Sequence, residues 1–166
     1  MRLRITQPPT GSIDGITLDH FRWGQVYELS STLASLFISK GWAEPAPLVL
    51  VVDDHDEVRQ LTVRLLKCHG YDVIEALDGG DALSSLCRYA PDLVILDLNM
   101  PLVDGWQFRA EQQRLADERL AGIPVLIMTG EEDAADHAEK LQAVGLVKKP
   151  FEIAHFLRAV ERALPC

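Results

Sequence analysis

Short aliphatic runs alternate with amphipathic stretches from residue 48 onward, and this alternation constrains the fold more than any other feature. Five runs are expected to be strands, at residues 48–52, 71–76, 93–96, 125–128 and 145–148. Five stretches are expected to be helices, at residues 56–68, 81–89, 105–115, 132–144 and 153–164. Strands that are apolar on both faces belong in a parallel sheet covered by helices on both sides. With right-handed crossovers, the pattern predicts an α/β fold, a doubly wound (βα)5 sheet that binds ligands at the carboxyl ends of its strands.

The first and last of these helices carry apolar residues at spacings of three and four, which predicts one buried stripe on each. The predicted stripes are Val58, Leu61 and Leu65 in the first helix and Phe156, Val160 and Leu164 in the last. Both helices are therefore expected to pack on the sheet.

Residues 1–46 have a different pattern and are predicted to form a small extension ahead of a main domain at 47–166. Residues 2–6 and 25–29 are strand candidates, Ser31 is expected to cap a helix that ends near Gly41, and residues 44–47 resemble a linker. The segment is expected to be ββα-like. Because so few residues rarely fold alone, we expect it either to dock on the main domain or to form a homodimer.

The charge distribution argues against nucleic acid and membranes as partners. The net charge is −9, and residues beyond 47 hold 21 acidic against 12 basic side chains, whereas phosphate-binding surfaces need clustered Lys and Arg. Cys68, Cys87 and Cys166 have no metal-ligand or disulfide spacing. The N-terminus lacks a signal-peptide apolar stretch and no run is long enough to span a bilayer, so a cytoplasmic protein is expected.

Polar residues interrupt the sequence where four of the predicted strands end. They are Asp53 and Asp54 after the first strand, Asp97 after the third, Thr129 after the fourth and Lys149 after the fifth. Each has an ordinary explanation when taken alone, since Asp54 and Thr129 could cap helices, Asp97 could occupy a turn and Lys149 could be a surface lysine. Together they are expected to converge at one edge of the sheet.

Three carboxylates at adjacent strand ends would repel one another unless a cation lay between them, and oxygen-only ligands favour Mg²⁺. A carboxylate that faces such a cation, with a hydroxyl and an ammonium nearby, has what is needed to accept a phosphoryl group. Asp97 is the central candidate for that acceptor.

At this point the sequence resembles the receiver family of two-component response regulators, over about residues 47–166. The resemblance rests on the segments VVDD at 51–54, DG at 78–79, VILDLNMP at 94–101, DG at 104–105, IMTG at 127–130 and KPF at 149–151. It implies a flavodoxin-like fold with strand order 2-1-3-4-5, in which a histidine kinase or phosphotransfer protein donates a phosphoryl group from a phosphohistidine.

The resemblance also implies a role for each site residue. Mg²⁺ would be bound by the side chains of Asp53, Asp54 and Asp97 and by the backbone carbonyl of Asn99. Thr129 and Lys149 would contact the phosphoryl oxygens, with Lys149 rather than Lys148 at the site because the family places the lysine before proline. A cis Lys149-Pro150 bond is implied as well.

Two positions bear on the switching and lifetime of the phosphorylated state. Leu146 stands where many receivers carry an aromatic switch residue, so we expect a movement of the Thr129 hydroxyl, not aromatic rotation, to bias the output surface. Asn99 and Glu131 carry polar groups that could position a water for hydrolysis beside the unobstructed Gly130. The alternative is that Glu131 only favours a helix N-terminus.

The predicted function is that of a phosphorylation-controlled interaction module, not a turnover enzyme, that acts on a downstream protein effector. No room is expected after Leu164 for an output domain, so the effector is either a partner or the N-terminal extension. One alternative is a haloacid-dehalogenase-like phosphatase with Asp54 as nucleophile, because residues 54–58 match its DxDx(T/V) motif. The other is a scaffold receiver that is never phosphorylated.

Overall fold

The computed structural model describes residues 1–13, 15–130 and 134–164, which form two compact units. The first unit comprises Met1–Pro47 and Leu66–Asp72, and the second comprises Leu48–Leu65 and the chain from Val73 onward. Residues 131–133 and Cys166 lie outside the described residues. The prediction for Glu131 and the start of the fourth predicted helix fall on these residues.

The second unit is built on the predicted five-stranded parallel sheet. Its strands are β6 (Leu48–Val52), β7 (Asp72–Ala76), β8 (Leu93–Leu96), β9 (Val125–Thr129) and β10 (Gly145–Lys148). Their spatial order is β10-β9-β8-β6-β7, which reads 2-1-3-4-5 from the β7 edge when the five strands are numbered along the chain. The register pairs Leu96 with Ile127 and Lys148 with Thr129, so the carboxyl ends of neighbouring strands reach one edge together.

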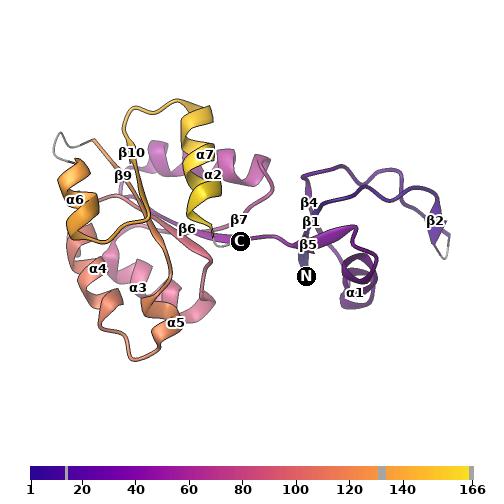
Figure 1. The fold of residues 1–166 in the computed structure, drawn as a ribbon, viewed down its shortest axis with the longest axis horizontal. Coiled ribbons are helices and arrows are strands. Elements are labelled where there is room, and N and C mark those ends of the chain that lie inside the picture. The colour runs from indigo at the N-terminus through magenta and orange to yellow at the C-terminus, as the bar shows by residue number, and fades with distance from the viewer. Residues whose placement is uncertain (14, 131–133, 165–166) are drawn as a thin grey trace. The chain divides into compact units, whose positions relative to one another are not determined.

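Helices cover both faces of this sheet (Figure 1). They are α2 (Asp56–Cys68), α3 (Gly79–Tyr89), α4 (Gly105–Gln113), α5 (Glu118–Ala121), α6 (Ala134–Lys140) and α7 (Ile153–Ala163). Helices α2 and α7 lie on one face, and α3 and α4 lie on the other. The α/β doubly wound fold is therefore confirmed, with one short helix, α5, that the sequence pattern did not predict.

The core follows from strand alternation, because successive side chains of a strand point to opposite faces. Leu50, Val52, Val94 and Leu96 belong to one apolar cluster, which also contains Phe108 of α4. Their neighbours Val49, Val51 and Ile95 are equally buried, at 0% exposure, and so fill the other face. The central strands are thus buried on both sides, as their continuous apolar sequences indicate.

The predicted stripe of the first helix was wrong at Leu61, which is 50% exposed. The buried face of α2 is formed by Arg59, Thr62, Val63 and Leu66. Spacing alone could not reveal this face, because two of its members are polar and are buried through hydrogen bonds.

The first unit contains more strands than the predicted ββα pattern. Strands β1 (Arg2–Ile5), β4 (Val26–Glu28) and β5 (Ala43–Pro45) form an antiparallel sheet in the order β4-β1-β5, accompanied by α1 (Ser31–Ser39). Strands β2 (Ser12–Ile13) and β3 (Ile16–Thr17) pair separately. Strand β5 was missed because its Pro-containing sequence resembles a linker, yet an edge strand tolerates proline. Helix α1 is capped by Ser30, not by Ser31 as predicted.

This unit has an apolar cluster of its own. The cluster joins Leu3 and Ile5 of β1 to Phe21, Ala34 and Phe37, all at most 3% exposed. The rings of Phe21 and Phe37 meet edge to face with centroids 4.8 Å apart, an arrangement that stabilises aromatic pairs. Residues near the N-terminus are therefore packed around buried aromatic side chains.

Candidate functional site

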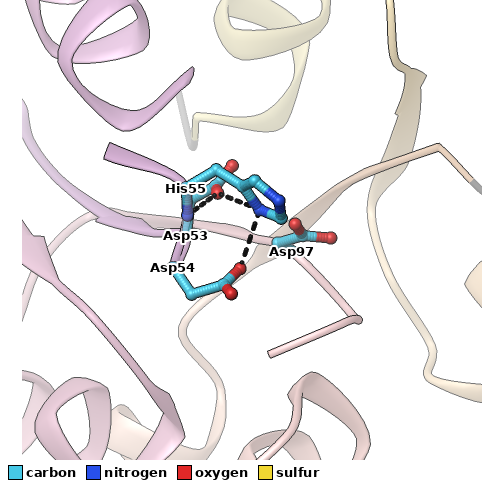
Figure 2. Close-up of side chains that lie close together, drawn as sticks. All are labelled: Asp53, Asp54, His55 and Asp97. Carbon is cyan, nitrogen blue, oxygen red and sulfur yellow. Dashed lines mark hydrogen bonds and ion pairs between the residues drawn. The ribbon is translucent and has the colours of Figure 1, made fainter. Parts of the chain in front are cut away.

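The predicted polar residues lie where strands of the parallel sheet end. Asp53 and Asp54 follow β6, Asp97 follows β8, Thr129 is the last residue of β9, and Lys149 follows β10. The backbone holds Asp97 against the first of these strands, since its N–H donates to the carbonyl oxygen of Val52 at 2.9 Å. Figure 2 shows the acidic side chains that gather at this edge.

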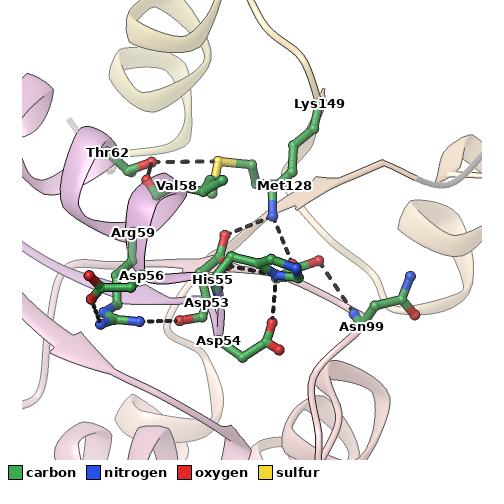
Figure 3. A network of polar contacts seen from close by, with 11 residues as sticks. Asp53, Asp54, His55, Asp56, Val58, Arg59, Thr62, Asn99, Met128 and Lys149 are labelled. Atoms are coloured by element: carbon green, nitrogen blue, oxygen red, sulfur yellow. Dashed lines mark hydrogen bonds and ion pairs between the residues drawn. The ribbon is translucent and has the colours of Figure 1, made fainter.

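Lys149 connects two of the carboxylates. Its Nζ atom donates to Asp53 Oδ2 and to Asp97 Oδ2, each at 2.7 Å (Figure 3). Asp53 is 0% and Asp97 4% exposed, whereas the Lys149 side chain is 18% exposed. One ammonium thus lies between two buried carboxylates, as expected for a lysine that balances an acidic pocket.

Burial and charge shift the pKa values of both Asp97 and Lys149. Burial raises the pKa of Asp97; the hydrogen bond and charge of Lys149 lower it but do not cancel the effect, and the nearby Asp53 raises it further. Burial alone would lower the pKa of Lys149, but its hydrogen bonds to Asp53 and Asp97 outweigh burial and raise it. The lysine is therefore held charged, while Asp97 is held as a carboxylate less readily than an exposed aspartate.

Asp54 and His55 complete the cluster. Asp53, Asp54, His55 and Asp97 each offer one atom that can bind a metal, and these four atoms all lie within 4.8 Å of one another. His55 Nδ1 is 3.0 Å from Asp54 Oδ1, and the His55 side chain is 68% exposed. Asp54 lies two residues before α2 begins, and its carboxylate contacts His55 within the cluster. His55 was not predicted as a site residue, although its position next to Asp54 was the available signal.

Three carboxylates that converge in this way fit a hard divalent cation. Asp53, Asp54 and Asp97 offer only oxygen, the donor that Mg²⁺ prefers, and one ammonium cannot neutralise all three. The backbone N–H of Asn99 donates to Asp97 Oδ1 at 3.3 Å, which brings the Asn99 main chain beside the cluster. The donor set therefore has the chemistry of a magnesium site.

Close backbone approaches fix the loop after β8. A Cβ atom on Gly105 would lie 2.5 Å from the carbonyl oxygen of Asp97, so only glycine permits α4 to begin this close to the acceptor candidate. Asp104 caps the same helix, and its carboxylate accepts from the N–H of Gln107 at 2.8 Å. The segments at 94–101 and 104–105 therefore act together to position Asp97.

The remaining predicted residues lie along the same edge. Thr129 is fully buried, and its carbonyl oxygen accepts from the N–H of Lys149 at 2.8 Å. Among the residues that the structure describes, none would lie within 4 Å of a Cβ atom on Gly130. The Lys149-Pro150 peptide bond is cis, as predicted, and Lys148 is exposed. Leu146 is partly buried against the core.

The second carboxylate of the DxDx(T/V) motif does not join the cluster. Asp56 lies in the first turn of α2, where it forms an ion pair with Arg59, and its side chain is 77% exposed. A phosphatase of that type would need Asp54 and Asp56 to face the same substrate. The geometry gives no support to that alternative.

Comparison with known proteins decides the family. Residues 49–161 match the model of the response regulator receiver domain, and this match covers more than half of the chain. The chain belongs to the response regulator receiver family. Proteins of this family are signalling components of two-component systems, and phosphorylation and Mg²⁺ binding are typical of them.

Several known proteins are similar to this chain. A probable transcriptional regulator of Porphyridium aerugineum is 36% identical over 69% of this chain and 50% of its own length. Sporulation initiation phosphotransferase F of Bacillus subtilis is 34% identical over 70% of this chain and 93% of its own length. A solved chemotaxis response regulator of Vibrio cholerae has a TM-score of 0.65 and 30% identity, over 72% of this chain and 99% of that one.

The extent of these matches differs between relatives. The chain spans about half the length of the first curated relatives that it matches, among them a DNA-binding transcriptional regulator of Synechocystis. Within the described part of the chain, no helix is both long enough and apolar enough to span a membrane.

Proposed function

We propose that this receiver accepts a phosphoryl group on Asp97 from the phosphohistidine of a histidine kinase or phosphotransfer protein. The observation that carries the proposal is the position of Lys149 Nζ, 2.7 Å from both Asp53 and Asp97, beside a third carboxylate at the carboxyl edge of the sheet. A buried carboxylate with an ammonium at hydrogen-bond distance has a nucleophile and positive charge in one place. The similarity to sporulation initiation phosphotransferase F supports the same chemistry.

In the proposed reaction, an oxygen of Asp97 attacks phosphorus while the P–N bond of the phosphohistidine breaks. The electron pair of that bond returns to the imidazole, and an acyl phosphate remains on Asp97. Lys149 then pairs with a phosphoryl oxygen, for which it must exchange its contact with the Asp97 carboxylate. The Thr129 hydroxyl is the proposed second partner of the phosphoryl oxygens.

The residues proposed to hold Mg²⁺ are Asp53, Asp54, Asp97 and the backbone carbonyl of Asn99. When bound, the ion neutralises negative charge that develops on the transferred phosphoryl oxygens. Asp53 is restrained for this task because its Oδ1 accepts from the N–H of His55 at 2.9 Å and its Oδ2 from Lys149. Asn99 is exposed next to the acceptor, which supports a role for its side chain in hydrolysis of the acyl phosphate.

We also propose a receiver domain at 47–166 that switches a protein-interaction surface for a downstream effector, preceded by an extension at 1–46 with its own role. Leu146 packs against the core in place of an aromatic residue. The proposed signal is therefore movement of the Thr129 hydroxyl toward the phosphoryl group, which would pull on the chain that follows β9.

Labelling with a small phosphodonor tests the acceptor directly. Wild-type protein incubated with acetyl phosphate and Mg²⁺ should approach one phosphoryl group per chain, and Asp97→Asn should lose the label. Asp92→Asn is a matched control, because Asp92 lies at the opposite end of β8 and accepts from the N–H of Leu48. Label at wild-type stoichiometry in Asp97→Asn would defeat the proposal. If wild-type protein became labelled without Mg²⁺, the proposed role of the ion in the reaction would be wrong.

A further inference from the structure

Arg59 is a buried cation behind the carboxylate cluster. It lies in the first part of α2 and is 6% exposed. Its NH1 donates to the backbone carbonyl of Asp53 at 2.9 Å, its NH2 pairs with Asp56, and its Nε lies 3.3 Å from Glu75 Oε2 on β7. Figure 3 shows the first two of these contacts on the side of Asp53 away from Lys149. The guanidinium thus joins three segments of the chain.

The contact with Asp53 completes the hydrogen bonding of that residue. Its N–H donates to the carbonyl oxygen of Ala76 at 3.3 Å, and its carboxylate accepts from His55 and Lys149. The carbonyl oxygen of Asp53, at the start of the turn into Asp54, accepts a hydrogen bond from Arg59. Rotation of that peptide would swing Asp54 away from Asp97, so the Arg59 contact restrains the direction of a proposed metal ligand.

Burying a guanidinium is costly unless its donors are used, and an apolar side chain would fill this part of α2 at lower cost. The contacts to Asp56 and Glu75 offset part of that cost but touch no site residue. The contact that reaches the site is the one with the Asp53 carbonyl. A residue that orients metal ligands in this way typically changes metal affinity by about 10- to 100-fold when it is replaced.

We propose that Arg59 is a positioning residue for the Mg²⁺ site, which it serves by fixing the Asp53–Asp54 peptide. This inference rests on the proposed function because it takes Mg²⁺ as the ligand. It assigns no contact between Arg59 and the ion or the phosphoryl group. The effect is transmitted through one hydrogen bond to the main chain.

The test compares Mg²⁺ dissociation constants, measured by calorimetry on the whole chain, with unfolding midpoints. Arg59→Gln should bind Mg²⁺ about tenfold more weakly than wild type, in line with other groups that orient metal ligands. Arg64→Gln removes an exposed arginine from the same helix and should leave the constant within twofold. Val63→Ala removes a buried apolar group and should lower the unfolding midpoint without weakening Mg²⁺ binding.

Amide dynamics give a second readout that does not depend on the ion. In Arg59→Gln without metal, the backbone amides of Asp54 and His55 should show increased motion by nuclear magnetic resonance, whereas Val63→Ala should not. Should Arg59→Gln fail to fold, Arg59→Lys keeps the charge but loses the forked donor set, and the same loss of affinity is expected.

Unchanged Mg²⁺ affinity in Arg59→Gln and Arg59→Lys would overturn the inference, as would equal weakening in Val63→Ala. These results differ from failure of the proposed function, in which wild type itself would neither bind Mg²⁺ nor accept a phosphoryl group on Asp97.

Discussion

Replacing Lys149 with methionine should destabilise the metal-free second unit by about 3 kcal/mol at neutral pH, because it leaves two buried carboxylates without their shared cation. Unit charges 2.7 Å apart attract by about 6 kcal/mol in an effective dielectric constant of about 20, and Lys149 makes two such contacts. Desolvation of the ammonium offsets most of this attraction. Truncating one partner of a buried ion pair typically costs about 3–5 kcal/mol, and the partial exposure of Lys149 places the expected loss at the lower end.

Mg²⁺ should reverse much of this loss. The ion supplies the positive charge that the variant lacks, and it no longer competes with an ammonium for Asp53 and Asp97. A ligand at about 100 times its dissociation constant stabilises the folded state by about 2.7 kcal/mol, and the variant should gain more than wild type at equal Mg²⁺ concentration.

Hydrogen exchange of the β8 amides measures stability within the second unit with and without Mg²⁺. Lys148→Met is the matched control, because Lys148 is exposed and its loss should change stability by less than about 0.5 kcal/mol. A loss below about 1 kcal/mol in metal-free Lys149→Met would refute the electrostatic reasoning, since it falls outside the range for broken buried pairs. An equal loss at saturating Mg²⁺ would refute it as well.

Four further predictions follow from burial and close contact. Because burial raises the pKa of Asp97, protons should compete with Mg²⁺ for this carboxylate at a higher pH than they would for an exposed aspartate, whose pKa is 3.8. Calorimetry should therefore show Mg²⁺ affinity falling as the pH is lowered. Mg²⁺ affinity that stays constant down to pH 3.8 would contradict this prediction. The same shift means that metal-free stability falls as pH rises through the pKa of Asp97. Gly105→Ala should lower both the melting temperature and Mg²⁺ affinity, because its Cβ would meet the Asp97 carbonyl. Gly130→Ala, whose Cβ would meet none of the described residues, should leave the melting temperature unchanged. Arg109→Met should cost about 1–3 kcal/mol, because it removes a buried donor to the carbonyl of Leu141; unchanged hydrogen exchange at the end of α6 would contradict this.

Much of the second unit could be predicted from sequence because its strands are buried on both faces. Continuous aliphatic runs mark such strands, and the observed β6, β8 and β10 have the predicted limits. The first unit was harder to predict because its strands are short and its sheet is antiparallel. Strand β5 includes Pro45, and the β2 and β3 strands have two residues each, too few to show a period.

The candidate site could be predicted for a topological reason. Parallel strands bring their carboxyl ends to one edge, so polar residues at the ends of different strands must approach one another. The structure brings Asp53, Asp97 and Lys149 within hydrogen-bond distance in this way. His55 had only its position next to Asp54 as a signal, and the contact of Arg59 with the Asp53 carbonyl could not be predicted, because it depends on a side-chain path that no spacing rule describes.

Mapping the phosphorylated residue is the sharpest test of Asp97 as the phosphoryl acceptor. Wild-type protein would be phosphorylated by acetyl phosphate in the presence of Mg²⁺, treated with borohydride to convert the acyl phosphate into a stable alcohol, and analysed by mass spectrometry. We expect the modification on Asp97 alone, and none after Mg²⁺ is chelated before the donor is added. Modification of Asp53 or Asp54 in place of Asp97, or an unmodified chain under conditions in which another receiver is labelled, would contradict the account.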